Sequence, residues 1–382
     1  MTIHRFAFPT DIRFGAGARR EAGPYLAAQG CARPLIVTDK GVAALPMLAE
    51  FKSTLGGLAV TVFSGVAGNP LKSQVDAGVA AYKQHNADAV IGFGGGAALD
   101  VAKAVALMSS HPGTVLEYAW DHPQVRAIEH DLPCFIALPT TAGTGSEVGR
   151  SSVISDDATH IKKIIFSAKL LAKAVFADPE LTVDLPPNVT AATGMDALTH
   201  NIESYLATGY HPMCDGIALE GVRIAARALP IAVREPRNLR ARSDMLMASM
   251  MGAVAFQKDL GATHSCAHAL STVVDLHHGL ANGIMLDYVM RFNQPAALDK
   301  FALMAEAAGV ARGTQEASAA AFVAWLTALK REVGIPAKLG EVKVSLQHLP
   351  QLLEVAVEDI CHRTNPRPCT RADFEHIFME AI

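Results

Sequence analysis

The first 180 or so residues alternate short apolar, β-branched runs with stretches of helical periodicity, and this alternation restricts the fold more than any other feature of the chain. Such alternation is typical of βαβ units, which build a mainly parallel sheet. Ligands of these sheets gather at the carboxyl ends of the strands. The expected strands span residues 34–39, 58–65, 88–95 and 134–141.

After about residue 190 the strand pattern stops, and long amphipathic segments rich in Ala, Leu and Met run to the end of the sequence. Pro186 and Pro187 stand at this change, where they would stop one element and allow a helix to begin. A chain of 382 residues is also too long for one ordinary core. We therefore expect an α/β domain over residues 1–182 and an all-helical domain over residues 183–382.

Composition excludes several classes of function. The formal net charge is −4 and no Lys/Arg run appears, so nucleic acid is not an expected partner. The apolar stretches are broken by glycines and charges within the roughly 20 residues that a membrane span requires. The N-terminal segment lacks a continuous apolar stretch before a cleavage site, and the six cysteines show no CxxC spacing. We expect a cytoplasmic protein with reduced thiols.

A glycine-rich turn follows the expected strand at residues 88–95. Gly94, Gly95 and Gly96 precede a helix that starts at about Ala97. Glycines let the backbone approach a ligand, and the free N–H groups of a first helical turn favour a pyrophosphate. Gly92, Gly94 and Ala97 also match a loose GxGxxA pattern, although in the third βα turn. The turn predicts a dinucleotide site, with a purely structural tight turn as the alternative.

Two further segments fit the same ligand. Asp39 ends the strand at 34–39, where its carboxylate could accept hydrogen bonds from a ribose diol and repel a 2′-phosphate, which favours NAD(H) over NADP(H). Its alternative role is to cap the next helix. The loop PTTAGTGSE at residues 139–147 offers the hydroxyls of Thr140, Thr141, Thr144 and Ser146 to a nicotinamide or ribose, or it is only a polar loop.

The helical half carries a cluster of acid and imidazole side chains. Asp196 and His200 are four residues apart, as are His264 and His268, and His278 follows after a break. Residues four apart share one helix face. One carboxylate with several neutral imidazoles suits Fe²⁺ or Zn²⁺ better than Mg²⁺ or Ca²⁺. Chance clustering of the fifteen histidines on solvated helix faces is the alternative explanation.

The sequence blocks GGGAALDVAK, PTTAGTGSEV, DPELT, GMDALTH and H-x3-H-x9-HG occur in this order and together resemble the iron-containing (group III) alcohol dehydrogenases. The resemblance covers nearly the whole chain. It implies a Rossmann-like, dinucleotide-binding α/β domain and an all-helical metal-binding domain, as in the dehydroquinate synthase-like architecture. It further implies an active site in the cleft between the two domains, and homodimers or larger assemblies.

The resemblance also assigns roles to residues. The implied metal ligands are Asp196, His200, His264 and His278. The implied NAD(H) contacts are Asp39, Asn69, Gly95, Gly96, Ala97, Ala98, Thr140, Thr141, Thr144 and Lys162, with the adjacent Lys163 as the alternative to Lys162. His268 matches a histidine near the substrate. Ala97 replaces the usual Ser, and the loss of its hydroxyl should weaken phosphate binding by on the order of 1 kcal/mol. His277 replaces a frequent Pro, so it could contact substrate, relay a proton or act only structurally.

The expected activity is that of a metal-dependent NAD(H) oxidoreductase that interconverts a small primary alcohol, or a small hydroxy acid such as 4-hydroxybutyrate, with its aldehyde. Fe²⁺ or Zn²⁺ would polarise the substrate oxygen, and His268 would pass the proton. Arg150 or Arg363 could hold a substrate carboxylate. The alternative is a dehydroquinate synthase-like lyase with transient hydride transfer, but the segments 194–205 and 261–283 lack the Lys/Arg side chains that its substrate phosphate needs.

Overall fold

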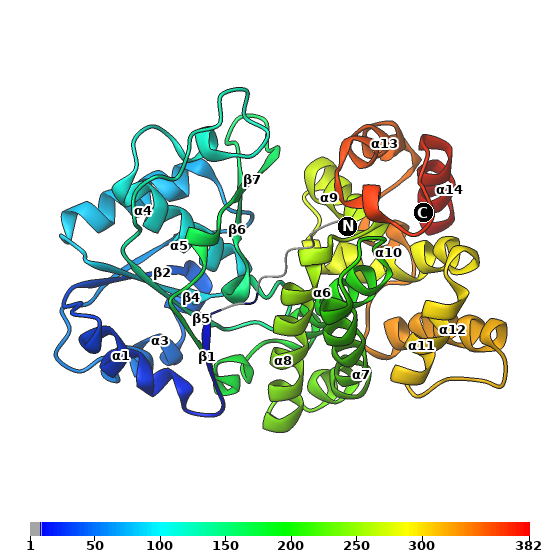
Figure 1. Ribbon diagram of the computed structural model, residues 1–382, viewed down its shortest axis with the longest axis horizontal. Helices are drawn as coiled ribbons and strands as arrows, with labels where there is room; N and C mark the ends of the chain where they lie inside the picture. The colour runs from blue at the N-terminus through cyan, green and yellow to red at the C-terminus, as the bar shows by residue number, and fades with distance from the viewer. Residues whose placement is uncertain (1–7, 9) are drawn as a thin grey trace, which may run out of the picture. The chain divides into compact units, whose positions relative to one another are not determined.

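The computed structural model describes residue 8 and residues 10–382, so residues 1–7 and 9 of the first expected domain lie outside it. The described residues divide into two compact units (Figure 1). We call residues 8–141 and 145–182 the sheet unit, and residues 142–144 and 183–382 the helical unit. The short segment 142–144, within the expected polar loop, is thus grouped with the helices.

The sheet unit contains a six-stranded parallel sheet in the order β1-β8-β5-β4-β2-β3. The four expected strands are present as β2 to β5. The sequence did not indicate β1 and β8 or the antiparallel hairpin of β6 and β7. The strands are β1 Asp11–Phe14, β2 Pro34–Asp39, β3 Thr61–Val66, β4 Ala89–Gly94, β5 Cys134–Pro139, β6 Ser151–Ser155, β7 Lys162–Phe166 and β8 Ala174–Ala177.

Helices cover both faces of this sheet (Figure 1). On one face, Leu26 of α1 and Phe51 of α3 pack in one buried cluster with the strand residue Phe93, and the Phe51 and Phe93 rings stack at 4.9 Å. On the other face α5 lies so close that a Cβ on Gly92 would come within 2.9 Å of Leu99 Cδ2. The helices of this unit are α1 Ala22–Ala28, α2 Lys40–Ala43, α3 Pro46–Ser53, α4 Lys72–Gln84 and α5 Gly96–Ser110.

Helix α6 forms the buried centre of the helical unit. It begins at Pro187, where proline is tolerated because the first N–H of a helix has no intrahelical partner. Every residue from Gly194 to Leu206 is buried, and α6 packs against α7, α8 and α10. The helices are α6 Pro187–Leu206, α7 Pro212–Arg234, α8 Leu239–Ala255, α9 Ala262–Val274, α10 His278–Asn293, α11 Leu298–Ala307, α12 Gln315–Glu332, α13 Leu349–Glu358 and α14 Arg371–Ala381.

Helices α6 and α7 approach closely at Gly221, and this contact gives a stability prediction. A Cβ on Gly221 would lie 1.9 Å from Asn201 Oδ1. Gly221→Ala should therefore lower the free energy of unfolding by about 1–3 kcal/mol, measured by urea denaturation. Gly216→Ala, on the same helix with no atom within 4 Å of the new Cβ, is the matched control and should not destabilise. Equal losses in both variants would contradict the packing argument.

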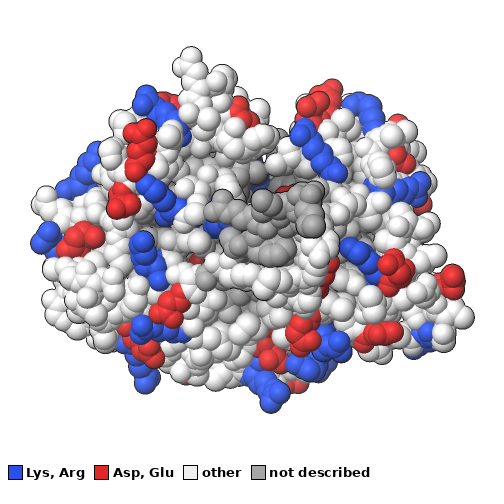
Figure 2. Space-filling model, in the orientation of Figure 1, with Lys and Arg blue, Asp and Glu red and all other residues white. Residues whose placement is uncertain are grey.

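The expected fold class is confirmed: a parallel sheet covered by helices on both faces, and a helical region after it. None of the helices within residues 10–382 is both long and apolar enough to cross a membrane. On the face shown in Figure 2, basic and acidic side chains are interspersed, without a continuous basic surface.

Candidate functional site

Three of the four expected metal ligands converge in the helical unit. Asp196 and His200 lie one turn apart on α6, and His264 lies in the first turn of α9. Asp196 Oδ1 is 4.0 Å from His200 Nε2 and 4.0 Å from His264 Nε2. One ligand atom from each of the three residues lies within 4.8 Å of the others. All three side chains are at least nine-tenths buried.

His278, the fourth expected ligand, begins α10 and places its Nε2 3.5 Å from Asp196 Oδ1. Metal bonds of about 2.1 Å in a tetrahedral arrangement put neighbouring donor atoms about 3.4 Å apart. The separations of 3.5 and 4.0 Å from the Asp196 oxygen are close to that spacing. The donor set therefore fits a single small divalent ion.

The charge state of His200 also suits a metal ligand. Burial lowers the pKa of His200 to about 4, because a charged imidazolium is disfavoured away from water, and the attraction of Asp196 offsets this only in part. The imidazole is therefore neutral at ordinary pH, which is the form that binds metals. One carboxylate with several imidazole ligands matches iron or zinc.

Asn282 is a site residue that the sequence reasoning missed. It lies on α10, one turn after His278, and is fully buried. Its Nδ2 donates to Asp196 Oδ1 at 2.7 Å and lies 3.3 Å from His264 Nε2. The four-residue spacing from His278 was the available signal. Asn282 orients the carboxylate at the centre of the ligand group.

Glu203 was also missed. It follows Asp196 and His200 on the same face of α6, and its carboxylate accepts a 2.7 Å hydrogen bond from His264 Nδ1. Burial alone would raise the pKa of Glu203, but the hydrogen bonds from His264 and Thr263 lower it below its usual value. Glu203 is therefore a buried anion behind a metal-ligand candidate. The i, i+4, i+7 spacing was the signal that could have found it.

His268, expected near the substrate, lies one turn after His264 on α9. Its ring stacks on that of His278 at 5.3 Å, and its Nδ1 donates to Asp359 Oδ2 at 2.7 Å. Burial would raise the pKa of Asp359, but the attraction and hydrogen bond of His268 hold it well below its usual value. Cys361 brings another ligand-type atom to this pair, although the histidine and the carboxylate already bind each other. His268 thus lies next to the ligand group, and its contacts with Asp359 and His278 fix the orientation of its ring.

His277 lies at the start of α10. Its side chain is exposed, and its Nδ1 accepts a long hydrogen bond of 3.4 Å from Leu280 N, which caps the helix. The capping contact corresponds to the structural alternative stated for this residue. The other two roles expected of His277, a contact to substrate and a proton relay, stay predictions.

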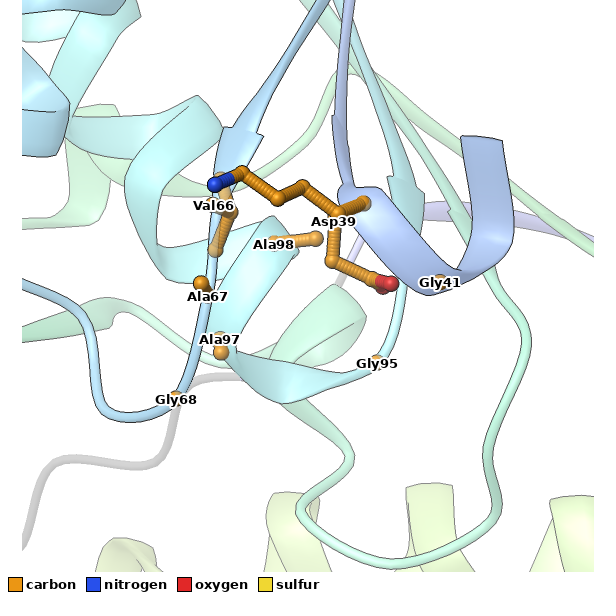
Figure 3. A pocket seen from close by; sticks show the side chains of 9 residues that line it. Asp39, Gly41, Val66, Ala67, Gly68, Gly95, Ala97 and Ala98 are labelled. Atoms are coloured by element: carbon orange, nitrogen blue, oxygen red, sulfur yellow. The ribbon is translucent and has the colours of Figure 1, made fainter. Parts of the chain in front are cut away.

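In the sheet unit, a cavity of about 300 Å³ lies where strands β2, β3 and β4 end (Figure 3). This is the carboxyl edge of a parallel sheet, where such folds bind ligands. Four residues expected to contact the cofactor line the cavity. Val66 at the end of β3, with Ala67 and Gly68 after it, was missed because small apolar residues give no signal. The lining residues are Asp39, Lys40, Gly41, Val66, Ala67, Gly68, Gly95, Ala97 and Ala98.

The glycine-rich turn is shaped for close approach. Gly94 has a φ of +154°, and a Cβ there would lie 2.7 Å from the Cβ of Ala98. Gly95 precedes Gly96, the first residue of the fifteen-residue helix α5. The first turn of α5 therefore begins at the cavity, with free N–H groups that suit a phosphate.

Asp39 has the capping role considered for it and also lies at the cavity. Its Oδ1 accepts a 2.8 Å hydrogen bond from Val42 N and so caps the short helix α2. The same side chain lines the cavity, beside Gly41 and Gly95 in Figure 3. A carboxylate has two oxygens, so capping leaves one of them for a ligand.

The remaining cofactor candidates lie on several segments. Thr140 N donates to Gly94 O at 3.0 Å, which places the start of the 139–147 loop beside the glycine turn, and Thr141 packs against Gly95. Thr144 is grouped with the helical unit. Asn69 follows β3, and Lys162 begins β7. Lys163 is paired with Asp121 at 2.6 Å.

A buried lysine joins two of the segments expected to contact the cofactor. Lys103 of α5 is fully buried, and its Nζ donates to Ser146 O, Ser146 Oγ and Ser151 O at 2.6–2.8 Å. Ser146 Oγ in turn donates to Asp100 of α5 at 2.6 Å. This network holds the end of the 139–147 loop against the helix that starts at the glycine turn. Two charged residues inside an apolar helical pattern were the signal for it.

Comparisons with known proteins agree with these observations. The family profile described as iron-containing alcohol dehydrogenase matches residues 9–179, and the profile of the C-terminal domain of the Fe-containing alcohol dehydrogenase family matches residues 190–382. A 4-hydroxybutyrate dehydrogenase from Cupriavidus necator is 36% identical over 364 residues, covering 92% of this chain and 93% of that protein.

Solved structures show the same similarity over the full length. The crystal structure of a 1,3-propanediol oxidoreductase superimposes with a TM-score of 0.95 at 33% identity, covering 100% of both chains. A sulfoacetaldehyde reductase from Bifidobacterium kashiwanohense, solved with NAD⁺, gives a TM-score of 0.90 at 30% identity over 100% of this chain and 99% of that one. The resemblance found in the sequence is confirmed, and the chain belongs to the iron-containing alcohol dehydrogenase family.

Proposed function

We propose that this chain is a metal-dependent NAD(H) oxidoreductase that interconverts a small primary alcohol, or a small hydroxy acid such as 4-hydroxybutyrate, with the corresponding aldehyde. The observation that carries the proposal is the convergence of Asp196, His200 and His264 in the buried centre of the helical unit. The similar proteins are named as dehydrogenases or reductases, which favours net oxidation and reduction over the lyase alternative.

The proposed ligands of the divalent ion are Asp196, His200, His264 and His278, with Fe²⁺ as the family ion and Zn²⁺ compatible with the same donors. When bound, the ion would supply Lewis acidity for a substrate oxygen, and the nicotinamide would supply the hydride chemistry. The chain's own task is to hold the carboxylate and the neutral imidazoles in place.

The proposed cofactor site is the cavity at the strand ends of the sheet unit. The first turn of α5, at Gly95, Gly96, Ala97 and Ala98, would hold the pyrophosphate, and Asp39 would accept hydrogen bonds from the adenosine ribose. Ala97 offers only its backbone N–H there. We further propose that the remaining candidates contact the cofactor along its length: Asn69, Thr140, Thr141, Thr144 and Lys162.

We propose that His268 passes a proton between the substrate oxygen and solvent. In support, its side chain is 23% exposed and its ring is fixed between the Asp359 carboxylate and the His278 ring. His277 is the second proposed participant, as a contact to substrate or a proton relay. Because Nδ1 of His268 is bonded to Asp359, Nε2 is the ring nitrogen that is available to exchange a proton.

His268→Ala should lower kcat by about 100-fold, which is typical for removal of a positioned proton-transfer group. The measurement is steady-state turnover across pH, together with metal content to show that the centre is intact. His376→Ala, an exposed histidine on α14, is the control and should behave as the wild type. If turnover and its pH profile both stayed unchanged in His268→Ala, the proposed role would be withdrawn.

Substrate class is tested by a turnover screen. Alcohols, hydroxy acids and their aldehydes would be assayed with NAD(H), on anaerobically iron-loaded and on zinc-loaded protein. The likeness to a 4-hydroxybutyrate dehydrogenase supports a hydroxy acid, and the likeness to a 1,3-propanediol oxidoreductase supports a plain alcohol. Formation of product without any change in NADH absorbance would favour the lyase instead.

We also propose that the chain acts in the cytoplasm as a homodimer or larger assembly, with residues 1–182 as the cofactor domain and residues 183–382 as the metal domain. The six cysteines are free thiols, which agrees with a reducing compartment. Light scattering on purified protein measures the assembly state, and separate expression of the two segments tests the boundary.

A further inference from the structure

The contact between His264 and Glu203 fixes which ring nitrogen carries the proton. A carboxylate only accepts hydrogen bonds, so the 2.7 Å contact requires His264 Nδ1 to be the protonated nitrogen. In the neutral imidazole, which is the form that binds metals, Nε2 then carries no proton. It faces the Asp196 carboxylate at 4.0 Å and the Asn282 amide nitrogen at 3.3 Å.

We propose that Glu203 is a positioning residue of the metal centre, which sets the tautomer and the ring orientation of His264 and strengthens its Nε2 as a donor. The proposal rests on the proposed function, because it takes His264 as a ligand of the ion. In this role Glu203 touches neither the ion nor the substrate and acts through the His264 imidazole.

The position of Glu203 is itself rigid. Both side chains of the pair are 1% exposed. Glu203 Oε1 accepts from Thr263 N at 2.6 Å, and Oε2 accepts from Gly261 N at 3.0 Å as well as from the His264 ring. The same carboxylate therefore holds the start of α9 and the ring on its first turn. A rotation of the ring would break the hydrogen bond of a buried anion, which is costly.

The electrostatic consequence follows from the charge. A buried carboxylate opposite Nδ1–H increases electron density on the imidazole and so raises its affinity for a cation at Nε2. Removal of such a partner typically weakens metal binding by about 10–100-fold. The neighbouring His268 and Asp359 make the same kind of pair with a 2.7 Å contact, but at a partly exposed position.

The test is the metal affinity of Glu203→Gln, measured by chelator competition with Zn²⁺ and, anaerobically, with Fe²⁺. We expect affinity to fall by about 10–100-fold. Stability should fall as well, because glutamine has one accepting oxygen where glutamate has two. Its NH₂ must therefore face either the Thr263 N–H or the Gly261 N–H and the His264 ring. Urea denaturation of the metal-free protein records that loss separately.

Asn365→Ala is the matched structural control. Asn365 Oδ1 accepts from Ala262 N at 3.2 Å, so it also supports the start of α9, but no hydrogen bond joins it to the His264 ring. This variant should lose stability and keep its metal affinity. If it lost as much affinity as Glu203→Gln, the role of Glu203 would be no more than support of the helix, and the proposal would be overturned.

A double-mutant cycle with His264→Ala separates the proposal from the function beneath it. Without the imidazole there is no ring to orient, so Glu203→Gln should have little further effect on metal affinity in that background. An equal effect in both backgrounds overturns the role of Glu203. If His264→Ala alone left metal affinity unchanged, the ligand set of the proposed function would fail instead.

Discussion

Asp196→Asn is expected to lower kcat/KM by about 1000-fold or more and to abolish stable metal binding. Asp196 Oδ1 is the atom that the other expected ligands share, with His200, His264 and His278 Nε2 at 3.5–4.0 Å. It is the one anion in that expected ligand set, so its removal leaves a divalent charge facing neutral nitrogens only. Loss of several kcal/mol of transition-state stabilisation corresponds to that fall in rate.

The measurement combines metal per chain, determined after gel filtration, with kcat/KM under metal-saturating conditions. Asp287→Asn is the matched control, because Asp287 of α10 is as buried as Asp196 but is paired with Lys330 at 2.5 Å. It should cost stability while one ion per chain is retained. An Asp196→Asn protein with full metal content and full turnover would place the ion elsewhere.

The sequence predicted the parts of the site that depend on local geometry. Asp196 and His200 share a face of α6 because helical periodicity puts residues four apart side by side. The glycine turn lies at the carboxyl end of β4 because a parallel sheet ends its strands at one edge. In both cases a span of fewer than about ten residues carries the information, and the structure agrees.

The parts that the sequence did not indicate depend on contacts between distant segments. Glu203 meets His264 across 61 residues of sequence, and Asp359 meets His268 across 91. The sequence around each carboxylate does not identify the histidine with which it pairs. Strands β1 and β8 have only four residues each and pair with each other at the sheet edge, so their formation depends on the sheet already being there.

Asp39→Ser is expected to shift the preference for NADH over NADPH, expressed as a ratio of kcat/KM values, by about 100-fold toward NADPH. The Asp39 carboxylate lines the cofactor cavity, where a 2′-phosphate would meet a like charge. Two unit charges 4 Å apart near a protein surface repel by roughly 4 kcal/mol. The solvent exposure of Asp39 weakens this repulsion toward about 2.7 kcal/mol, the free energy that corresponds to a 100-fold change in the ratio. Serine is chosen because its hydroxyl can still cap α2 at Val42 N.

The control for this shift is Asp88→Ser, which changes the net charge of the chain by the same amount. Asp88 is also half-buried, and its carboxylate accepts from Ala32 N and Arg33 N at 2.9 Å, but it does not line the cavity. Its coenzyme ratio should equal that of the wild type. If the coenzyme ratio shifted equally in both variants, the preference for NADH would come from the overall electrostatic field of the protein. A shift confined to Asp39→Ser assigns the preference to a single carboxylate at the end of β2, and so places the adenosine ribose in that cavity.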